Sequence, residues 1–118
     1  MKKALFILLG LALILMLWLG VCFGEEIDYD KMVRAIFQAE GGYKATYLYG
    51  IKSVDYKYEH EARQICYNSV RNNHRRWIKA GKPKDFISFM GDRYCPPTIH
   101  KLNKNWVKNV TYFYKENQ

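Results

Sequence analysis

Apolar residues recur along most of the chain at the spacing of amphipathic α-helices. The first such pattern runs to about Glu40 and follows Asp28 and Asp30, either of which can cap its N-terminus. Gly41 comes next, and a glycine there can take the left-handed conformation that ends a helix. The apolar face of this predicted helix consists of Met32, Val33, Ile36 and Phe37.

Further helical patterns follow later in the chain. The longest starts at a cap formed by Ser53 or Asp55 and ends near Gly81. A short helix is predicted over residues 85–90, and Asn103 is predicted to cap the last helix. The stripe of the longest helix contains Ala62, Ile65, Cys66, Ser69, Val70, Asn73 and Trp77. The apolar stripe of the last helix consists of Trp106, Val107, Val110, Phe113 and Tyr114.

Other segments lack a helical pattern. Residues 43–58 are rich in aromatic and β-branched residues and contain Gly50, which predicts an irregular loop with a small β-hairpin. Such an aromatic loop suits the faces of sugar rings, and it suits an ordinary core loop equally well. Residues 91–97 include two prolines, so a break is predicted there. The chain is therefore expected to be mainly α, with a short loop or hairpin region after the first helix.

The N-terminus has the residue order of a secretory signal. Lys2 and Lys3 precede an apolar run over residues 4–23. We therefore predict a signal peptide over residues 1–24 and one exported domain over residues 25–118, periplasmic or secreted. The alternative is an uncleaved anchor in the inner membrane, since the run is near the ~20 residues that span a bilayer. Membrane contact is expected only in that case.

The chain is basic, with a formal net charge of +8. A basic exported protein commonly meets anionic polymers of the cell envelope, although the charge can equally serve solubility alone. Residues 71–76 are rich in arginine and asparagine, and we interpret them as a solvated helix face. No nucleic-acid partner is expected in this compartment, and we expect a monomer.

The cysteines of the predicted mature chain are Cys66 and Cys95. An even count in an oxidising compartment predicts one disulfide, whose loop of about 29 residues would stabilise the fold by roughly 3–4 kcal/mol. Free thiols are the alternative. Cys22 is not expected to carry a lipid, because the bulky Val21 precedes it. No metal site is expected, because the histidines show no ligand spacing; they are His60, His74 and His100.

Glu40 is the candidate for chemistry. It follows Ile36 by four residues and Phe37 by three, so it lies on the apolar face of its helix. An ionised carboxylate loses hydration when buried, which raises its pKa. Gly41 and Gly42 allow a ligand to approach the backbone closely. These features are typical of a general acid, although a surface glutamate before an ordinary helix end has the same pattern.

Several motifs, taken in order, resemble the lysozyme-like superfamily, particularly its goose-type lysozyme and soluble lytic transglycosylase branch. They are Ala39-Glu40-Gly41-Gly42 at a helix end, Tyr49-Gly50-Ile51 shortly after, and the segments 89–94 and 103–110. The resemblance covers nearly all of the predicted mature chain. The chain departs from the family in having glycine where a serine usually follows the catalytic glutamate, and in lacking a Gly-Leu-Met-Gln segment.

The resemblance implies a small lysozyme-like domain that acts on peptidoglycan glycan strands without metal or organic cofactor. Glu40 would protonate the oxygen between N-acetylmuramic acid and N-acetylglucosamine. Tyr94 would hydrogen-bond near Glu40, or serve only as a core residue. Hydrolysis usually needs a second carboxylate, for which Asp55 is the only acid in the following loop, whereas a lytic transglycosylase needs one. The residues expected to shape the cleft are Gly41, Gly42, Tyr49, Gly50 and Ile51.

Other functions fit the same sequence. A wall-binding module could keep the fold and lack activity, as a missing second acid would suggest. A small secreted interaction protein or inhibitor could instead bind a partner through its basic face. Both stay open alongside the enzyme.

Overall fold

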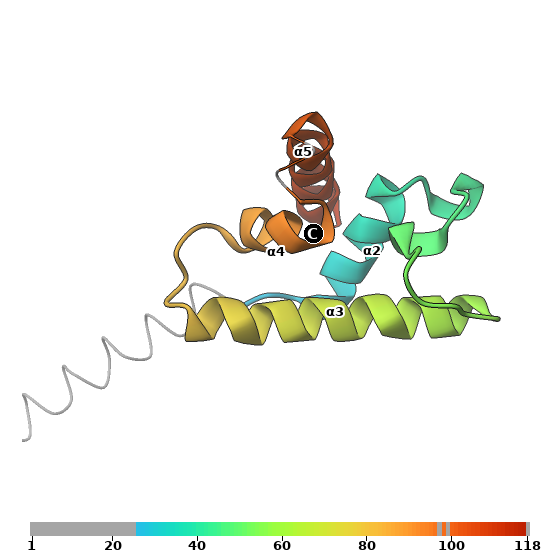
Figure 1. The fold of residues 1–118 in the computed structure, drawn as a ribbon, viewed down its shortest axis with the longest axis horizontal. Coiled ribbons are helices and arrows are strands. Elements are labelled where there is room, and N and C mark those ends of the chain that lie inside the picture. The colour runs from blue at the N-terminus through green and yellow to red at the C-terminus, as the bar shows by residue number, and fades with distance from the viewer. Residues whose placement is uncertain (1–25, 97, 99, 118) are drawn as a thin grey trace, which may run out of the picture.

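The computed structural model describes residues 26–96, 98 and 100–117, and this part of the chain is mainly α-helical (Figure 1). The helices are α2 (Tyr29–Ala39), α3 (Glu59–Lys79), α4 (Phe86–Tyr94) and α5 (His100–Glu116). Short 3₁₀ turns, η1 (Gly42–Lys44) and η2 (Leu48–Gly50), follow α2. The predicted helical class is confirmed. The predicted signal peptide lies outside the described residues.

Helix α2 forms as its local sequence predicts. Asp28 caps it by accepting a hydrogen bond from the backbone N–H of Lys31 at 3.1 Å. The helix ends at Glu40, and Gly41 follows with a φ of 103°, which glycine adopts without strain. Its core face consists of Met32, Val33, Ala35 and Ile36.

The loop between α2 and α3 contains no strand, so the predicted hairpin is wrong. Tyr49 and Gly50 have φ values of 57° and 69°, and left-handed backbone interrupts an extended strand. Helix α3 begins later than predicted, and Ser53 and Asp55 do not cap it. The carboxylate of Glu61 instead accepts a hydrogen bond from the backbone N–H of Lys57 at 3.0 Å, near the start of α3.

Helices α4 and α5 pack closely against each other, and two sequence-based predictions in this region are wrong. Helix α4 continues through Gly91 to Tyr94, where a break was predicted. A Cβ at Gly91 would lie 2.9 Å from Val107 Cγ2, so glycine here allows two helices to approach. Asn103 lies inside α5 and is not its N-cap. Its Nδ2 donates to the carbonyl oxygens of Gly91 and Cys95, at 3.1 and 2.6 Å, and thereby fixes the end of α4.

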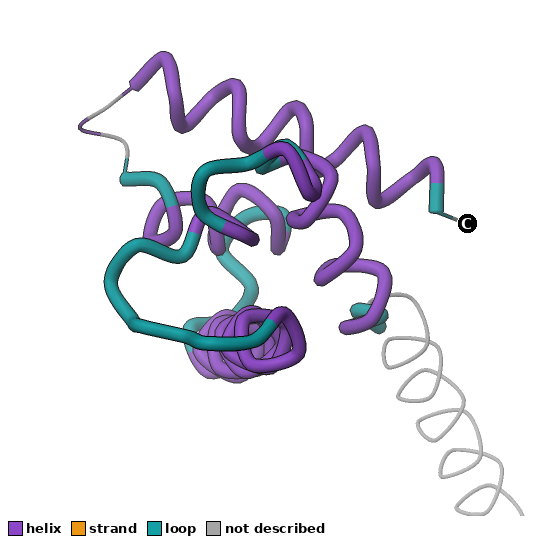
Figure 2. Tube along the Cα trace, turned by 90° about the vertical axis from the view of Figure 1, so that its right-hand side faces the viewer, coloured by secondary structure: helices purple, strands orange, loops and turns teal. Residues whose placement is uncertain are grey.

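The helices form layers around one core. Figure 1 shows α3 along one side of the molecule, and Figure 2, in which α3 is seen end-on, shows α5 on the opposite side. Helices α2 and α4 lie between them and pack against both. The largest fully buried side chains are Met32, Ile36, Met90, Val33, Val70, Val110 and Cys66. Within the described residues, none of the helices combines the length and hydrophobicity that a membrane crossing requires.

Candidate active site

The carboxyl group of Glu40 lies where three segments of chain meet. Glu40 itself ends α2, and Trp106 of α5 donates its Nε1–H to Glu40 Oε1 at 2.9 Å. Gly50 of η2 lies directly against the same carboxyl group. A Cβ built at Gly50 would be 2.7 Å from both Cδ and Oε2 of Glu40, a distance that real side chains do not show. A residue larger than glycine at position 50 would therefore push the carboxyl group out of this position.

The surroundings of Glu40 favour its neutral form. Burial raises the pKa of the Glu40 carboxyl group, because water solvates the charged form less well there. The hydrogen bond from Trp106 and the positive charge of Lys52 lower the same pKa, but by less than burial raises it. The structure thus agrees with the raised pKa that the sequence predicted for Glu40. Its cause is burial of the carboxyl group between the apolar face of α2 and the η2 turn.

Tyr94 connects both of the segments that contact Glu40. Its hydroxyl group donates to the carbonyl oxygen of Tyr49, which directly precedes Gly50. Its ring stacks on the indole of Trp106, with ring centroids 5.2 Å apart. Burial raises the pKa of the Tyr94 hydroxyl well above its usual range, so the group remains a donor. Tyr94 is therefore placed to hold the two neighbours of Glu40, and no direct hydrogen bond joins it to Glu40 among the described contacts.

The predicted disulfide is not formed. Cys66 is buried and Cys95 half-buried, and both are free thiols in the part of the chain that the structure describes. The hydroxyl of Tyr94 lies close enough to Cys66 to affect the pKa of its thiol, so the sulfur of Cys66 faces the side of the candidate site. Burial raises the pKa of the Cys66 thiol to about 12. Besides burial, the charge of Glu40 helps to raise the pKa of both the Cys66 and the Cys95 thiol, so both sulfurs lie in the surroundings of Glu40.

The other residues expected to shape the cleft have different positions. Gly41 and Gly42 make the turn from α2 into η1. The side chain of Tyr49 is buried beside Phe37, with ring centroids 5.1 Å apart, so its backbone rather than its ring serves the site. Ile51 is buried and lines a groove described next.

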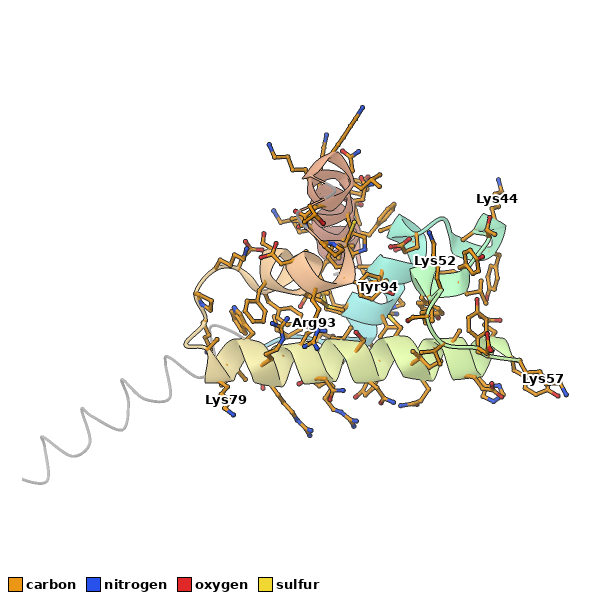
Figure 3. All side chains as sticks on the ribbon, viewed as in Figure 1. Lys44, Lys52, Lys57, Lys79, Arg93 and Tyr94 are labelled. Atoms are coloured by element: carbon orange, nitrogen blue, oxygen red, sulfur yellow. The ribbon has the colours of Figure 1, made fainter. Side chains whose placement is uncertain are left out.

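A continuous groove runs along α3 from Gly50, and we call it the α3 groove. Its first part, of about 230 Å³, is lined by Gly50, Ile51, Lys52, Ser53, Val54, Ile65, Cys66, Ser69, Arg93 and Tyr94. Its second part, of about 440 Å³, is lined by Val54, Ile65, Asn68, Ser69, Asn72, Asn73, Arg93 and Tyr94. The two parts share the lining residues Val54, Ile65, Ser69, Arg93 and Tyr94, so they adjoin each other. Figure 3 shows Arg93 and Tyr94 between α4 and α3, beside this groove.

The α3 groove comes near Glu40 at Gly50, which lines the groove and lies against the carboxyl group, while Glu40 itself is not among the lining residues. Its lining includes Lys52 and Arg93 and contains no aspartate or glutamate among the described residues. Asp55 is exposed on the loop before α3 and is not one of the lining residues. Glu40 thus lies behind Gly50, next to the groove, and Asp55 does not line the groove.

Sequence reasoning missed Trp106, Lys52 and Arg93 as parts of the site. Trp106 was assigned to an apolar stripe and to the segment 103–110, without a role at Glu40, yet a buried indole N–H usually finds an acceptor, and that need was a usable signal. Lys52 and Arg93 carried no local signal, because their relation to Glu40 depends on how the η2 loop and α4 pack on α3.

Comparison of the chain with family models, curated proteins and solved structures gives no match. Within residues 26–96, 98 and 100–117, no cluster of histidine, cysteine, aspartate or glutamate has the size that a metal site needs. What the site can do must therefore be argued from its own geometry.

Proposed function

We propose that this protein cleaves the glycan strands of peptidoglycan, with Glu40 as general acid and base. The observation that carries the proposal is the half-buried carboxyl of Glu40, which accepts a hydrogen bond from Trp106 and lies against Gly50, a residue that lines an open groove. A carboxyl group with a raised pKa keeps its proton to higher pH and can protonate a leaving oxygen. The resemblance of the motifs to lysozyme-like proteins supports the choice of substrate.

The chemistry needs one carboxyl group if the product is an anhydro sugar. Glu40 donates its proton to the glycosidic oxygen, the bond from that oxygen to the muramic acid anomeric carbon breaks, and the second sugar leaves as an alcohol. The carboxylate of Glu40 then takes the proton of the muramic acid 6-hydroxyl, whose oxygen bonds to the same anomeric carbon. Glu40 ends protonated, so no second acid and no water are consumed. The described residues that line the groove include no aspartate or glutamate, which favours this transglycosylase reaction over two-carboxylate hydrolysis.

Tyr94 supports this reaction as a positioning residue. It holds the backbone next to Gly50 through the Tyr49 carbonyl, and it stacks on the Trp106 ring that donates to Glu40. A shift of either neighbour would misalign the proton of Glu40 relative to a bound sugar.

The proposal includes an extracytoplasmic location, because peptidoglycan lies outside the cytoplasmic membrane. The signal-like order of residues 1–24 supports it, with Lys2 and Lys3 before an apolar run. Mature protein from its native host is then expected to begin at Glu25, or to retain the N-terminal segment as an anchor.

A digest of purified sacculi tests the proposal. Mass spectrometry of the released muropeptides is expected to find anhydro ends. Reducing ends would instead indicate a hydrolase of the same bond. No release from any peptidoglycan type, together with firm sacculus binding, would favour an inactive wall-binding module.

A further inference from the structure

The α3 groove extends well beyond Glu40, along a polar face of α3. Asn68 and Asn72 lie four residues apart, as do Ser69 and Asn73, so the two pairs follow the same helix face. The span from position 65 to position 72 is about 10 Å at the helical rise of about 1.5 Å per residue. Arg93, from the last turn of α4, lies across from this face. The groove is thus long enough for more than one sugar ring.

The asparagine side chains in this part of the groove differ in how many of their hydrogen-bonding atoms already have a partner within the protein. Asn73 donates to the carbonyl oxygen of Ser69 at 2.8 Å and accepts from Arg76 at 2.8 Å, so its role is structural. Asn68 accepts from Gln64 at 2.9 Å, which leaves its Nδ2 donors open toward a ligand. Asn72 is exposed and has no partner among the described contacts. An open carboxamide can donate and accept at once, which matches the N-acetyl amide of a sugar.

Arg93 is the cation of this part of the groove. It lines both parts, is exposed, and forms no ion pair or hydrogen bond with another described residue. None of the described residues that line the groove is an aspartate or glutamate that could neutralise its charge. A planar guanidinium without a partner is suited to binding a carboxylate through two parallel hydrogen bonds.

We infer that the α3 groove selects glycans that carry a carboxylate, with Arg93 binding this carboxylate while Asn68 and Asn72 bind N-acetyl groups. The inference deepens the proposed function and rests on it for the muramic acid backbone. A polymer with a phosphate in every unit fits less well, because its charges would also meet the uncharged amides and the carboxyl of Glu40. The selected carboxylate belongs either to the lactyl group of muramic acid or to the peptide attached to it.

Binding to matched glycans tests the inference. The Glu40→Gln protein, used to prevent turnover, is titrated calorimetrically with an oligomer of alternating N-acetylglucosamine and N-acetylmuramic acid. The oligomer is prepared with the lactyl carboxyl free, converted to a primary amide, or extended by a dipeptide with a free carboxylate. We expect the carboxylate forms to bind about tenfold more tightly than the amide, the gain of one charge-assisted contact. The free lactyl acid and the dipeptide form distinguish the two sources of the carboxylate.

Substitutions then assign the effect to one residue. Arg93→Ala is expected to remove the preference for the carboxylate and to leave binding of the amide form unchanged within about twofold. Arg93→Lys is expected to restore part of the preference, because an ammonium group attracts the carboxylate without the paired geometry. Arg75→Ala is the matched control: Arg75 is exposed on α3 and is not among the groove-lining residues, so this variant should keep the full preference.

Several outcomes would overturn the inference. The first two are equal binding of the oligomers with a free and with an amidated carboxyl group, and no binding of either oligomer. The other two are an Arg93→Ala protein that still prefers the carboxylate form, and displacement of the glycan by an equimolar glycerol-phosphate polymer. A parallel digest of sacculi by the wild-type protein separates this question from the proposed function. Cleavage without a charge preference would contradict only the Arg93 assignment. A preference that depends on Arg93, without cleavage, would support this assignment and contradict the enzyme.

Discussion

Trp106 and Glu40, 66 positions apart in the sequence, are joined by a hydrogen bond of 2.9 Å from the indole Nε1–H to the carboxyl Oε1. The bond connects the end of α2 to α5 and sets the direction in which the carboxyl group points. It also opposes the effect of burial, because a donor stabilises the charged form of an acid. The protonation of Glu40 is therefore set by two tertiary effects of opposite sign.

Replacing Trp106 by phenylalanine is expected to raise the pKa of Glu40 further, since it removes the N–H that stabilises the carboxylate. The pH above which cleavage falls off should therefore move upward, and the maximal rate should drop because the carboxyl group loses its orientation. Trp77→Phe is the matched control, because Trp77 Nε1 donates to the Lys84 carbonyl at 2.7 Å, apart from the site. If the pH profiles of the two variants coincide, the bond from Trp106 does not control Glu40.

Replacing Gly50 by alanine is expected to displace the carboxyl group of Glu40, because the new Cβ would lie 2.7 Å from it. We expect a loss of cleavage of at least about tenfold, as small misplacements of reacting groups produce. The φ of +69° adds a backbone strain of about 1–2 kcal/mol. Gly81→Ala separates the two effects, since Gly81 has a φ of +82° and nothing within 4 Å of a built Cβ. Equal activity losses in the two variants would mean that strain alone is responsible.

Replacing Tyr94 by phenylalanine is expected to lower the maximal rate of the folded protein while changing KM little. The variant keeps the ring that stacks on Trp106 but loses the hydrogen bond to the Tyr49 carbonyl. The loss should reduce stability by about 1 kcal/mol. Tyr114→Phe is the comparison, because the Tyr114 hydroxyl accepts an N–H bond from Asp28 at 3.3 Å on the surface. An unchanged rate per folded Tyr94→Phe molecule would leave Tyr94 with a packing role only.

Protein produced in an oxidising compartment and unfolded without reductant is expected to show both Cys66 and Cys95 as reactive thiols. In the folded protein Cys66 should react far more slowly, because it is buried and its pKa is raised to about 12, so almost no thiolate is present. Thiol titration in the presence and absence of denaturant measures both statements. A count of zero in denaturant would show that the disulfide forms after all.

Local signals were sufficient for α2 and for its functional residue. Asp28, the apolar face and the following glycine fix the ends of that helix, and the same pattern puts Glu40 on its buried side. Both the position of Glu40 and the direction of its pKa shift could therefore be predicted from nearby residues. The neighbours that complete the site are far away in sequence, and no local pattern pairs Trp106 with Glu40.

The errors arose where residues with a strong local preference serve a tertiary contact. The two prolines suggested a break over residues 91–97, but α4 continues to Tyr94, and Gly91 within it allows α4 to approach α5. Asn103 suggested a helix start, but its amide bonds to the end of α4. Tyr49 suggested a strand, yet it has a left-handed backbone while its carbonyl accepts from Tyr94. In each case packing between elements outweighed the propensity of the single residue.

The decisive variant, Glu40→Gln, should fold at least as well as the wild-type protein. The raised pKa means that the folded state holds its proton to higher pH than the unfolded chain, so the stability from this group falls as pH rises between the two pKa values. Glutamine does not ionise, so the variant does not lose this stability as the pH rises. At neutral pH we expect only a small gain, because the half-exposed group is partly screened by water. It should disappear below about pH 4, where the acid is neutral in both states. Thermal unfolding of both proteins, at neutral pH and below about pH 4, measures this difference in stability.

The most direct test is the release of muropeptides from purified sacculi by the wild-type and Glu40→Gln proteins, quantified by mass spectrometry at equal concentrations of folded protein. Glutamine keeps the shape and the acceptor for Trp106 but has no proton to transfer. We expect wild-type protein to release anhydro muropeptides and the variant to release them at least about 100-fold more slowly, the usual contribution of a general acid. Release by Glu40→Gln at the wild-type rate would contradict the account.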